Sequence, residues 1–141
     1  MKIPAQIYKQ KVHRVKNKEN TLRGSFVAFG DWGIQSLSFK MCKTNELEAA
    51  RKVLNKKMKN LGKVFVRVSS DIPVSKKPKE LKLGKGVGKR DHFSTAINTG
   101  RIIFEFSQVN EVFAKSLAKL VGDKIGVKTR LVKKYLYLQN A

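Results

Sequence analysis

Basic residues outnumber acidic ones by a wide margin in this chain. Its 141 residues include 31 Lys and Arg against 10 Asp and Glu, which gives a formal net charge of +21. Small soluble domains usually carry a net charge of magnitude about 2–8, and self-repulsion on the present scale opposes a compact state. A polyanionic partner would relieve that repulsion. The alternative is a merely well-solvated surface, but solvation alone would tolerate both signs of charge.

The chain nevertheless holds enough apolar residues to build a folded core. Hydrophobic residues make up 41% of it, including eight Phe, whereas chains kept disordered by their charge are poor in such residues. The length fits one domain, and no apolar stretch approaches the roughly 18–20 residues of a membrane span. The basic N-terminus lacks the apolar block of a secretory signal, so we expect a protein of the cell interior or of an organelle.

Two segments carry the three- and four-residue apolar spacing of amphipathic helices. The first runs from about Asn45 to Leu61, with Thr44 placed to cap it and Gly62 to end it. The second spans about Asn110 to Val121, with Asn110 as its cap. The residues expected to face the core are Leu47, Ala50, Leu54, Met58 and Leu61 in the first helix, and Phe113, Leu117, Leu120 and Val121 in the second.

Other segments have the composition of strands, bounded by glycine, proline or asparagine. They are residues 24–30, 34–40 and 64–68, and a hairpin in which residues 92–97 and 101–106 flank the turn Asn98-Thr99-Gly100. Pro73 and Pro78 mark a loop before this hairpin. Helices and strands do not alternate in a βαβ rhythm, which favours an α+β fold over a doubly wound α/β fold.

We therefore expect a single compact α+β domain in which two helices pack on a mainly antiparallel sheet. It would cover residues 24–132. A basic N-terminal arm, residues 1–23, would precede it, and a basic, aromatic tail, residues 133–141, would follow it.

The segment ELKLGKGVGKR, residues 80–90, alternates glycines with cations. It is not a nucleotide-binding P-loop, because Arg90 stands where Ser or Thr is needed and Leu83 where the first glycine is needed. Glycines let a backbone approach a phosphate or ribose closely. The cations that would neutralise phosphates there are Lys82, Lys85, Lys89 and Arg90. The segment predicts a loop that enters an RNA crevice, with an ordinary flexible surface loop as the alternative.

The sequence offers no pattern of catalytic or metal-binding groups. Cys42 is the only cysteine, so neither an internal disulfide nor a cysteine-rich metal cluster can form. His13 and His92 have no partners at metal-ligand spacing. Glu105 lies in an apolar strand and is expected to face outward or to pair with a lysine. We expect no catalysis and no cofactor.

Further side chains are candidates for RNA contact. Trp32, between two glycines, is either an exposed aromatic that stacks on an unpaired base or a core or hinge residue. Tyr135 and Tyr137 leave the same two roles open. A row of lysines on the first helix is either solvated or bound to RNA, and it consists of Lys52, Lys56 and Lys59.

Several motifs occur in a distinctive order. They are LEAARKV (47–53), GKVFVRV (62–68), DIPVSKKP (71–78), the glycine-lysine run (84–88) and GRIIFE (100–105), preceded by KVHR (11–14) and FGDWG (29–33). In this order they resemble the universal large-subunit ribosomal protein sixteen family. The likeness covers roughly residues 9–132, nearly the whole domain.

The chain departs from that family's pattern in its loop. Lys82-Leu83-Gly84 stands where the family usually has Arg-Met-Gly, Val87 where another lysine is common, and Ser69-Ser70 where an aromatic-proline pair is common. An Arg-to-Lys exchange keeps the charge but loses the planar fork of donors. These departures suggest a divergent member of mitochondria, with the bacterial cytoplasm or a plastid as alternatives. The likeness starts almost at Met1, which suggests an organelle-encoded protein.

The resemblance implies a compact α+β domain of the hammerhead type and a structural role without chemistry. A member of this family docks on large-subunit rRNA near the peptidyl-transferase centre and the A-site tRNA, beside other ribosomal proteins. The loop that would lie near tRNA consists of Lys82, Gly84, Lys85, Gly86, Gly88, Lys89 and Arg90. The candidate rRNA-binding residues are Lys9, Lys11, His13, Arg14, Lys16, Arg23, Arg51, Lys56, Lys76, Lys77 and Arg130.

Three other functions compete with this one. A free-standing RNA-binding chaperone of another family is the main alternative. An RNA-modifying enzyme would need a cofactor pocket or paired catalytic groups, and the sequence offers neither. Binding to a membrane surface would need a helix with large exposed apolar residues opposite its basic face, whereas the first helix has a simple core-facing stripe.

Overall fold

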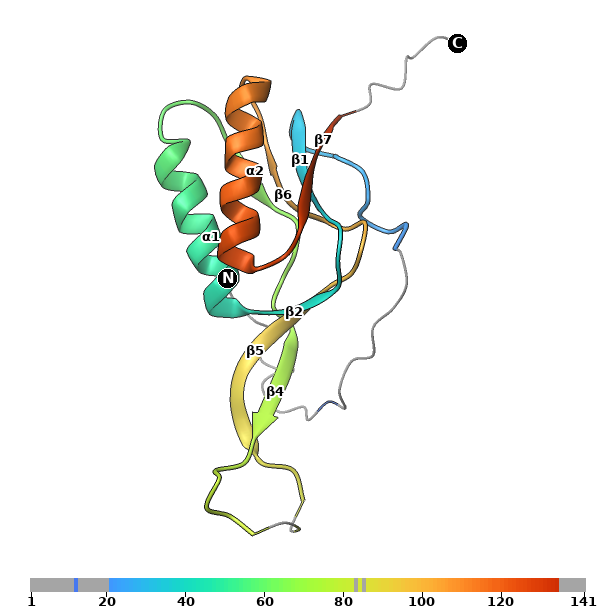
Figure 1. Cartoon of the computed structure of the whole chain (residues 1–141), viewed down its shortest axis with the longest axis vertical. Coiled ribbons are helices and arrows are strands. Elements are labelled where there is room, and N and C mark those ends of the chain that lie inside the picture. The colour runs from blue at the N-terminus through green and yellow to red at the C-terminus, as the bar shows by residue number, and fades with distance from the viewer. Residues whose placement is uncertain (1–11, 13–20, 83, 85, 135–141) are drawn as a thin grey trace.

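The computed structural model describes residues 12, 21–82, 84 and 86–134, and these form an α+β domain (Figure 1). Its fold class agrees with the sequence prediction. In chain order the elements are β1 (Trp32–Ser36), β2 (Lys40–Lys43), α1 (Thr44–Lys57), β3 (Val64–Val66), β4 (Ile72–Lys76), β5 (Lys89–Ile97), β6 (Ile102–Phe106), α2 (Glu111–Ile125) and β7 (Thr129–Lys133). Within the described ranges, neither helix is long and apolar enough to cross a membrane.

The strands form two sheets rather than the one that the sequence suggested. A four-stranded sheet has the order β3-β6-β1-β7, and a three-stranded sheet has the order β2-β5-β4. All of their pairings are antiparallel. The predicted strand over residues 34–40 is therefore divided: β1 belongs to the first sheet and β2 to the second.

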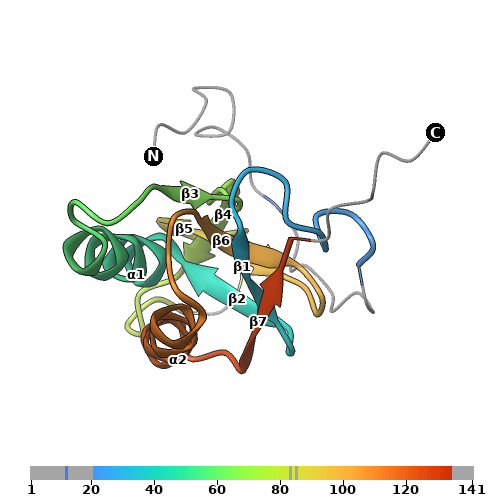
Figure 2. The ribbon, with the colours of Figure 1, turned by 90° about the horizontal axis from the view of Figure 1, so that it is seen from above.

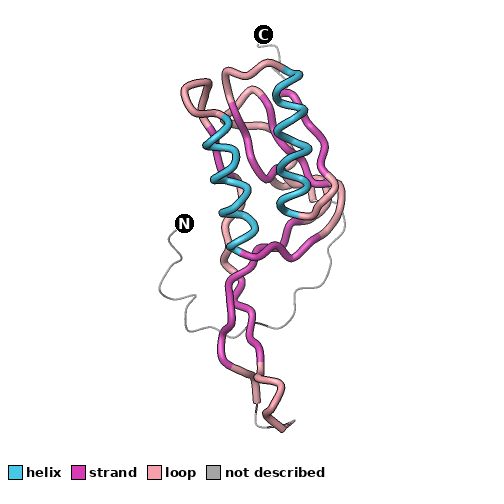
Figure 3. The backbone as a smooth tube through the Cα atoms, turned by 60° about the vertical axis from the view of Figure 1, so that its left-hand side comes forward, coloured by secondary structure: helices cyan, strands magenta, loops and turns pink. Residues whose placement is uncertain are grey.

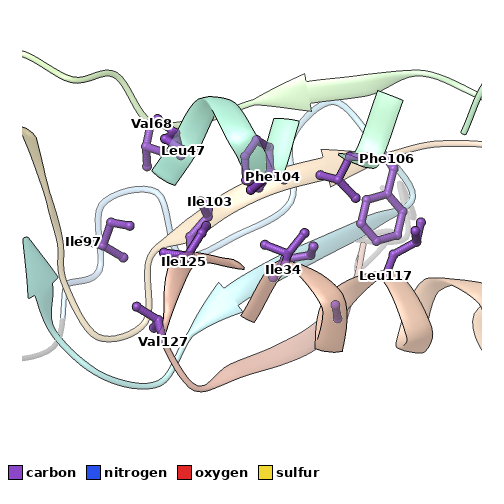
Figure 4. Close-up of a cluster of buried hydrophobic side chains, with 14 of the residues drawn as sticks. Ile34, Leu47, Val68, Ile97, Ile103, Phe104, Phe106, Leu117, Ile125 and Val127 are labelled. Carbon is purple, nitrogen blue, oxygen red and sulfur yellow. The ribbon is translucent and has the colours of Figure 1, made fainter. Parts of the chain in front are cut away.

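The core lies between the two helices and one face of the four-stranded sheet. Helices α1 and α2 run side by side (Figures 2 and 3). Leu47 of α1 and Leu117 of α2 are buried with Ile34, Phe104 and Phe106 of the sheet (Figure 4). Each such side chain stabilises the fold by about 1.5–3 kcal/mol through the apolar area it removes from water. The stripes predicted from helical spacing thus mark the core-facing sides of both helices, but Phe113 and Leu120 are only half-buried and Leu61 is 55% exposed.

The predicted hairpin over residues 92–106 is wrong. β5 pairs with β2 and β4, whereas β6 pairs with β1 and β3. Between them, Gly100 adopts a φ of +88°, and its N–H donates a hydrogen bond to the carbonyl of Ser36. The chain therefore passes from one sheet to the other instead of turning back on itself.

The hairpin of this fold is formed by β4 and β5. The sequence predicted a loop around Pro73, but this residue lies in β4 opposite Phe93. Proline is compatible with a strand when the strand is at the edge of a sheet, because no ladder hydrogen bond from its nitrogen is needed. β4 is such an edge strand.

The helix ends differ from the predicted ones. α1 ends at Lys57, before Gly62, and a Cβ atom on Gly62 would lie 2.1 Å from the carbonyl oxygen of Ser107. This glycine therefore allows a close backbone contact rather than ending the helix. Thr44 does not cap α1, because Lys43 is its N-cap and the Thr44 hydroxyl donates to the carbonyl of Phe93.

The second helix is longer than predicted. α2 continues past Val121 to Ile125. Its C-cap residue is Gly126, whose φ of +68° lies in the left-handed region that favours glycine. Asn110 is the N-cap residue, as predicted, although its side chain makes no capping hydrogen bond. After α2, residues Thr129–Lys133 form β7, which pairs with β1 and has no counterpart among the predicted strands.

The predicted strand over residues 24–30 is also wrong, since this segment is a loop. Val27 is buried against Gly33 of β1, where an added Cβ would lie 2.7 Å from the valine side chain. Ile34, the next residue, belongs to the core under the helices. Because successive side chains of a strand point to opposite faces, the loop covers the face of the sheet away from the helices (Figure 2).

Candidate nucleic-acid interface

The β4–β5 hairpin carries its connecting loop, residues 77–88, to one end of the molecule (Figures 1 and 3). The stretch from Lys76 to Asp91 contains seven Lys and Arg residues and two acidic residues. Of its described cations, Lys77 is half-buried and the others are exposed. The hairpin therefore extends a concentrated positive charge away from the body.

The glycines of this loop serve two different purposes. Gly84 and Gly86 have φ values of +99° and +78°, and an added Cβ at either position would meet nothing within 4 Å. Both are needed for the backbone conformation and not for space. At Gly88 a Cβ would lie 2.5 Å from the carbonyl oxygen of Lys76, so this glycine permits the close approach of the two chain segments. The ammonium of Lys77 donates to the carbonyl of Gly84 across the loop.

The loop and the adjoining strand ends enclose a hollow. Its walls include Lys82, Lys89 and Arg90, together with the exposed apolar side chains of Leu81 and Val87. The Arg90 guanidinium carbon lies 4.9 Å from the centre of the Phe93 ring, a cation–π geometry that orients its donors. Cations beside an open glycine backbone suit phosphate and ribose groups. Of the described loop residues that the sequence singled out, Lys82, Gly84, Gly88, Lys89 and Arg90 line this hollow, and Gly86 does not.

The remaining candidate rRNA-binding residues are spread over the molecule. Lys76 and Lys77 belong to the hairpin, and Lys56 is exposed on α1. Arg23 is exposed in a turn before β1, and the Nη2 of Arg130 on β7 donates to the Gln35 amide oxygen at 2.7 Å. Several candidates lie outside the described residues, namely Lys9, Lys11, His13, Arg14, Lys16, Lys85, Tyr135 and Tyr137.

Arg51 is bound to an acidic neighbour. Its Nη2 lies 2.5 Å from a Glu48 carboxylate oxygen, and its Nε donates to the other oxygen at 3.0 Å. Hydrogen bonding within this pair lowers the pKa of Glu48 and raises the pKa of Arg51. Contact with a phosphate would have to compete with Glu48, so Arg51 is a weaker candidate than the lysines of the hairpin.

Glu105 does not face outward, as one of its two predicted roles required. Its side chain is fully buried, and it forms an ion pair with Arg67 rather than with a lysine. The carboxylate also accepts hydrogen bonds from three consecutive backbone N–H groups, of Ala28, Phe29 and Gly30, at 3.2, 2.7 and 2.9 Å. These bonds replace the strand pairing that the sequence predicted for this segment, and they hold the loop on the sheet.

The aromatic residues that are exposed differ from Trp32, the stacking candidate that the sequence suggested. Trp32 packs against the core, and its Nε1 donates to the carbonyl of Val109 at 3.1 Å, so the interpretation as a core residue is confirmed. Instead Phe26 and Phe29 are 65% and 66% exposed. The run GSFVAFG was a signal for them, but its apolar composition between two glycines suggested a strand.

Among the described residues, no reactive side chains are arranged for chemistry. Cys42 is fully buried, and this burial raises the pKa of its thiol to about 12, so a nucleophilic thiolate is absent at neutral pH. The part of the chain that the structure describes contains no group of three or more His, Cys, Asp or Glu side chains placed to hold a metal ion.

A basic α+β domain with a projecting cationic hairpin is a protein built to bind a polyanion. Comparison with known families shows which family the chain matches. The family model described as "Ribosomal protein L16p/L10e" matches residues 4–132. Because the match spans most of the chain, the protein belongs to the ribosomal protein L16p/L10e family. It is a structural, non-enzymatic component of the large ribosomal subunit and binds ribosomal RNA beside other ribosomal proteins. A chaperone of another family is thereby excluded.

Proposed function

We propose that the protein binds rRNA near the peptidyl-transferase centre and that its β4–β5 hairpin helps to position the A-site tRNA. The observation that carries the proposal is the placement of the glycine-lysine loop at the end of the molecule, on two strands that extend from the body (Figure 1). In the family that the sequence resembles, this loop reaches toward the acceptor ends of tRNA.

The chemistry of the loop supports contact with a phosphate backbone rather than base-specific recognition. Lys82 and Lys89 present flexible ammonium groups, which act as point charges and do not read a base edge. Gly84 and Gly86 leave the backbone open to a phosphate or ribose. Such contacts position an RNA but carry little sequence information, which fits a site that must accept many different tRNAs.

The rRNA contacts would come from the rest of the basic surface. We assign them to the N-terminal arm (residues 1–23), to the C-terminal tail (residues 133–141) and to the candidate cations of the body. Among these, Lys56 and Arg23 are exposed. Recognition would depend mainly on the shape of folded RNA and on its phosphates.

We further propose that the ribosome in question is mitochondrial. The proposal rests on the departures from the family's loop pattern, Lys82-Leu83-Gly84 and Val87. Fractionation of cells and sedimentation of the organelle's large subunits test it. Recovery of the protein only in cytoplasmic or plastid large subunits would overturn the mitochondrial assignment alone.

The tRNA proposal is tested with large subunits reconstituted from the variant Lys82→Gln/Lys89→Gln. Its matched control, Lys119→Gln/Lys124→Gln, removes the same charge from exposed positions on α2. We expect both proteins to enter the subunit. Binding of A-site tRNA should weaken at least about tenfold for the hairpin variant, the loss expected from one charge-assisted hydrogen bond. Equal tRNA binding by the two variants would refute the proposal.

A further inference from the structure

The loop over residues 24–30 exposes two large aromatic side chains. Phe26 and Phe29 are 65% and 66% exposed, although Val27 between them is only 7% exposed. Exposing this much aromatic surface forfeits the stabilisation that burial would bring. The segment is not merely loose, because its middle is packed onto Gly33 of the sheet.

The backbone that carries Phe29 is fixed by the buried Glu105. The N–H of Phe29 donates to this carboxylate at 2.7 Å, and the N–H groups on either side bind the same carboxylate. The Phe29 ring is supported in turn by Phe65, whose ring centre lies 5.9 Å away. The Arg67 guanidinium carbon lies 5.1 Å from the centre of the Phe29 ring. Phe29 is still 66% exposed despite these contacts, so the ring is held in place and remains accessible.

Cations surround this loop. Arg67 lies beside Phe29, and the Lys134 ammonium donates to the carbonyl of Ala28 at 3.3 Å. The Gln35 amide links the loop to β7, since it donates to the carbonyl of Ser25 and accepts from Arg130. The negative charge of Glu105 is buried and matched by Arg67. Asp31, just after the loop, is an exposed acidic residue whose carboxylate accepts the N–H of Gln108.

We propose that Phe29, assisted by Phe26, stacks on an unpaired base of the large-subunit rRNA. A rigid, exposed aromatic ring beside an arginine is the arrangement that binds single-stranded bases, and the flanking cations would hold the adjoining phosphates. An apolar surface on a partner protein would not explain the two cations Lys134 and Arg130 near the loop. The inference rests on the rRNA binding of the family, and it is independent of the proposed tRNA contact of the hairpin.

The test measures the affinity of the full-length protein for deproteinised large-subunit rRNA, with substitutions at Phe29. Phe29→Ala should weaken binding about fivefold to 100-fold, the range found for removal of one stacked base. Phe29→Leu should weaken it nearly as much, whereas Phe29→Trp should bind like the unchanged protein. Val112→Ala, which alters a residue that is 77% exposed on α2, is the control and should have no effect.

A second measurement is made in reconstituted large subunits by chemical probing of unpaired bases. At least one base protected by the unchanged protein should become reactive with Phe29→Leu and stay protected with Phe29→Trp. Full protection and affinity with Phe29→Leu would show an aliphatic contact and overturn the stacking. Unchanged binding by Phe29→Ala would overturn the site altogether.

The two proposals fail separately in these experiments. Phe29 variants that bind rRNA normally, beside a hairpin variant that loses tRNA, would remove the stacking site and leave the proposed function intact. Weakened rRNA binding by Phe29 variants, beside a hairpin variant with normal tRNA binding, would do the reverse.

Discussion

The hairpin loop, residues 77–88, and the loop over residues 24–30 both contain glycines, but the first lies at the end of the molecule and the second lies on the four-stranded sheet. The first is crossed by a hydrogen bond from Lys77 to the Gly84 carbonyl, and its glycines face open space at two positions. The second is bound to a buried carboxylate through three consecutive N–H groups. The first concentrates charge on an adaptable backbone, whereas the second fixes an aromatic surface.

This difference indicates two kinds of RNA contact in one small protein. Charge on an adaptable loop follows a phosphate backbone wherever it runs, and its contribution falls with salt concentration. An aromatic ring on a rigid support acts only where a base is unpaired and correctly placed, and stacking depends little on salt. We expect the hairpin to tolerate substitutions that the loop over residues 24–30 does not.

The largest effect expected from this difference concerns Arg67. Replacing it with methionine would leave Glu105 buried with its charge balanced only by backbone N–H groups. Removing one partner of a buried ion pair is strongly destabilising, so the free energy of unfolding should fall by about 3 kcal/mol. Urea unfolding of the full-length protein measures it. In the hairpin, Lys82→Met should change the same quantity by less than about 0.5 kcal/mol.

The pairing itself can be isolated with Glu105→Gln. In the Arg67→Met background this second substitution should cost less than it does in the unchanged protein, because the uncompensated charge is then removed. Costs that add within about 0.5 kcal/mol would mean that the two side chains are not coupled.

A smaller effect is expected at Gly30. A Cβ there would lie 2.6 Å from the carbonyl oxygen of Phe106 and 2.9 Å from its backbone nitrogen. Backbone atoms inside a sheet cannot give way, so Gly30→Ala should lift the loop and lower the free energy of unfolding by about 1–3 kcal/mol. Hydrogen exchange at the Phe29 amide should accelerate. Gly84→Ala in the hairpin strains a positive φ but meets no neighbouring atom, so it should cost less. The opposite order would contradict the comparison.

The same two regions mark what the sequence could predict about the fold. Helices α1 and α2 were found because their apolar spacing is local, and a helix satisfies its own backbone hydrogen bonds. Strand partners are not local. Residues 92–106 have the composition of a hairpin, but their two strands belong to different sheets. Residues 24–30 have the composition of a strand, but a carboxylate far along the chain takes their N–H groups.

The candidate site divides in the same manner. The cations and glycines of residues 80–90 are visible in the sequence itself, and the resemblance to a family gave them a meaning. The place of these residues at the end of a hairpin depends on β4. The sequence predicted a loop there because of Pro73 and Pro78. The placement of Phe29 depends on Glu105 and Arg67, whose interaction joins strand β6 and the residue after β3 with the loop. The periodicity of a single segment cannot reveal an interaction between residues that are far apart in the sequence.

The smallest predicted effect separates the two kinds of RNA binding by their salt dependence. For rRNA or tRNA that the hairpin touches, the slope of log affinity against log salt should become shallower by about 0.7–0.9 for each phosphate that is no longer neutralised. Lys82→Gln/Lys89→Gln removes two cations, so the slope should change by roughly twice that amount. Between about 0.1 and 0.2 M salt this amounts to under about 1 kcal/mol.

Phe29→Leu should lower the affinity at every salt concentration and leave the slope unchanged, because a stacked base releases no counterions. Titrations at four or more salt concentrations would decide the matter. A shallower slope with Phe29→Leu would mean that its loop holds phosphates through the ring's orientation of Arg67, and the two loops would then both bind RNA electrostatically.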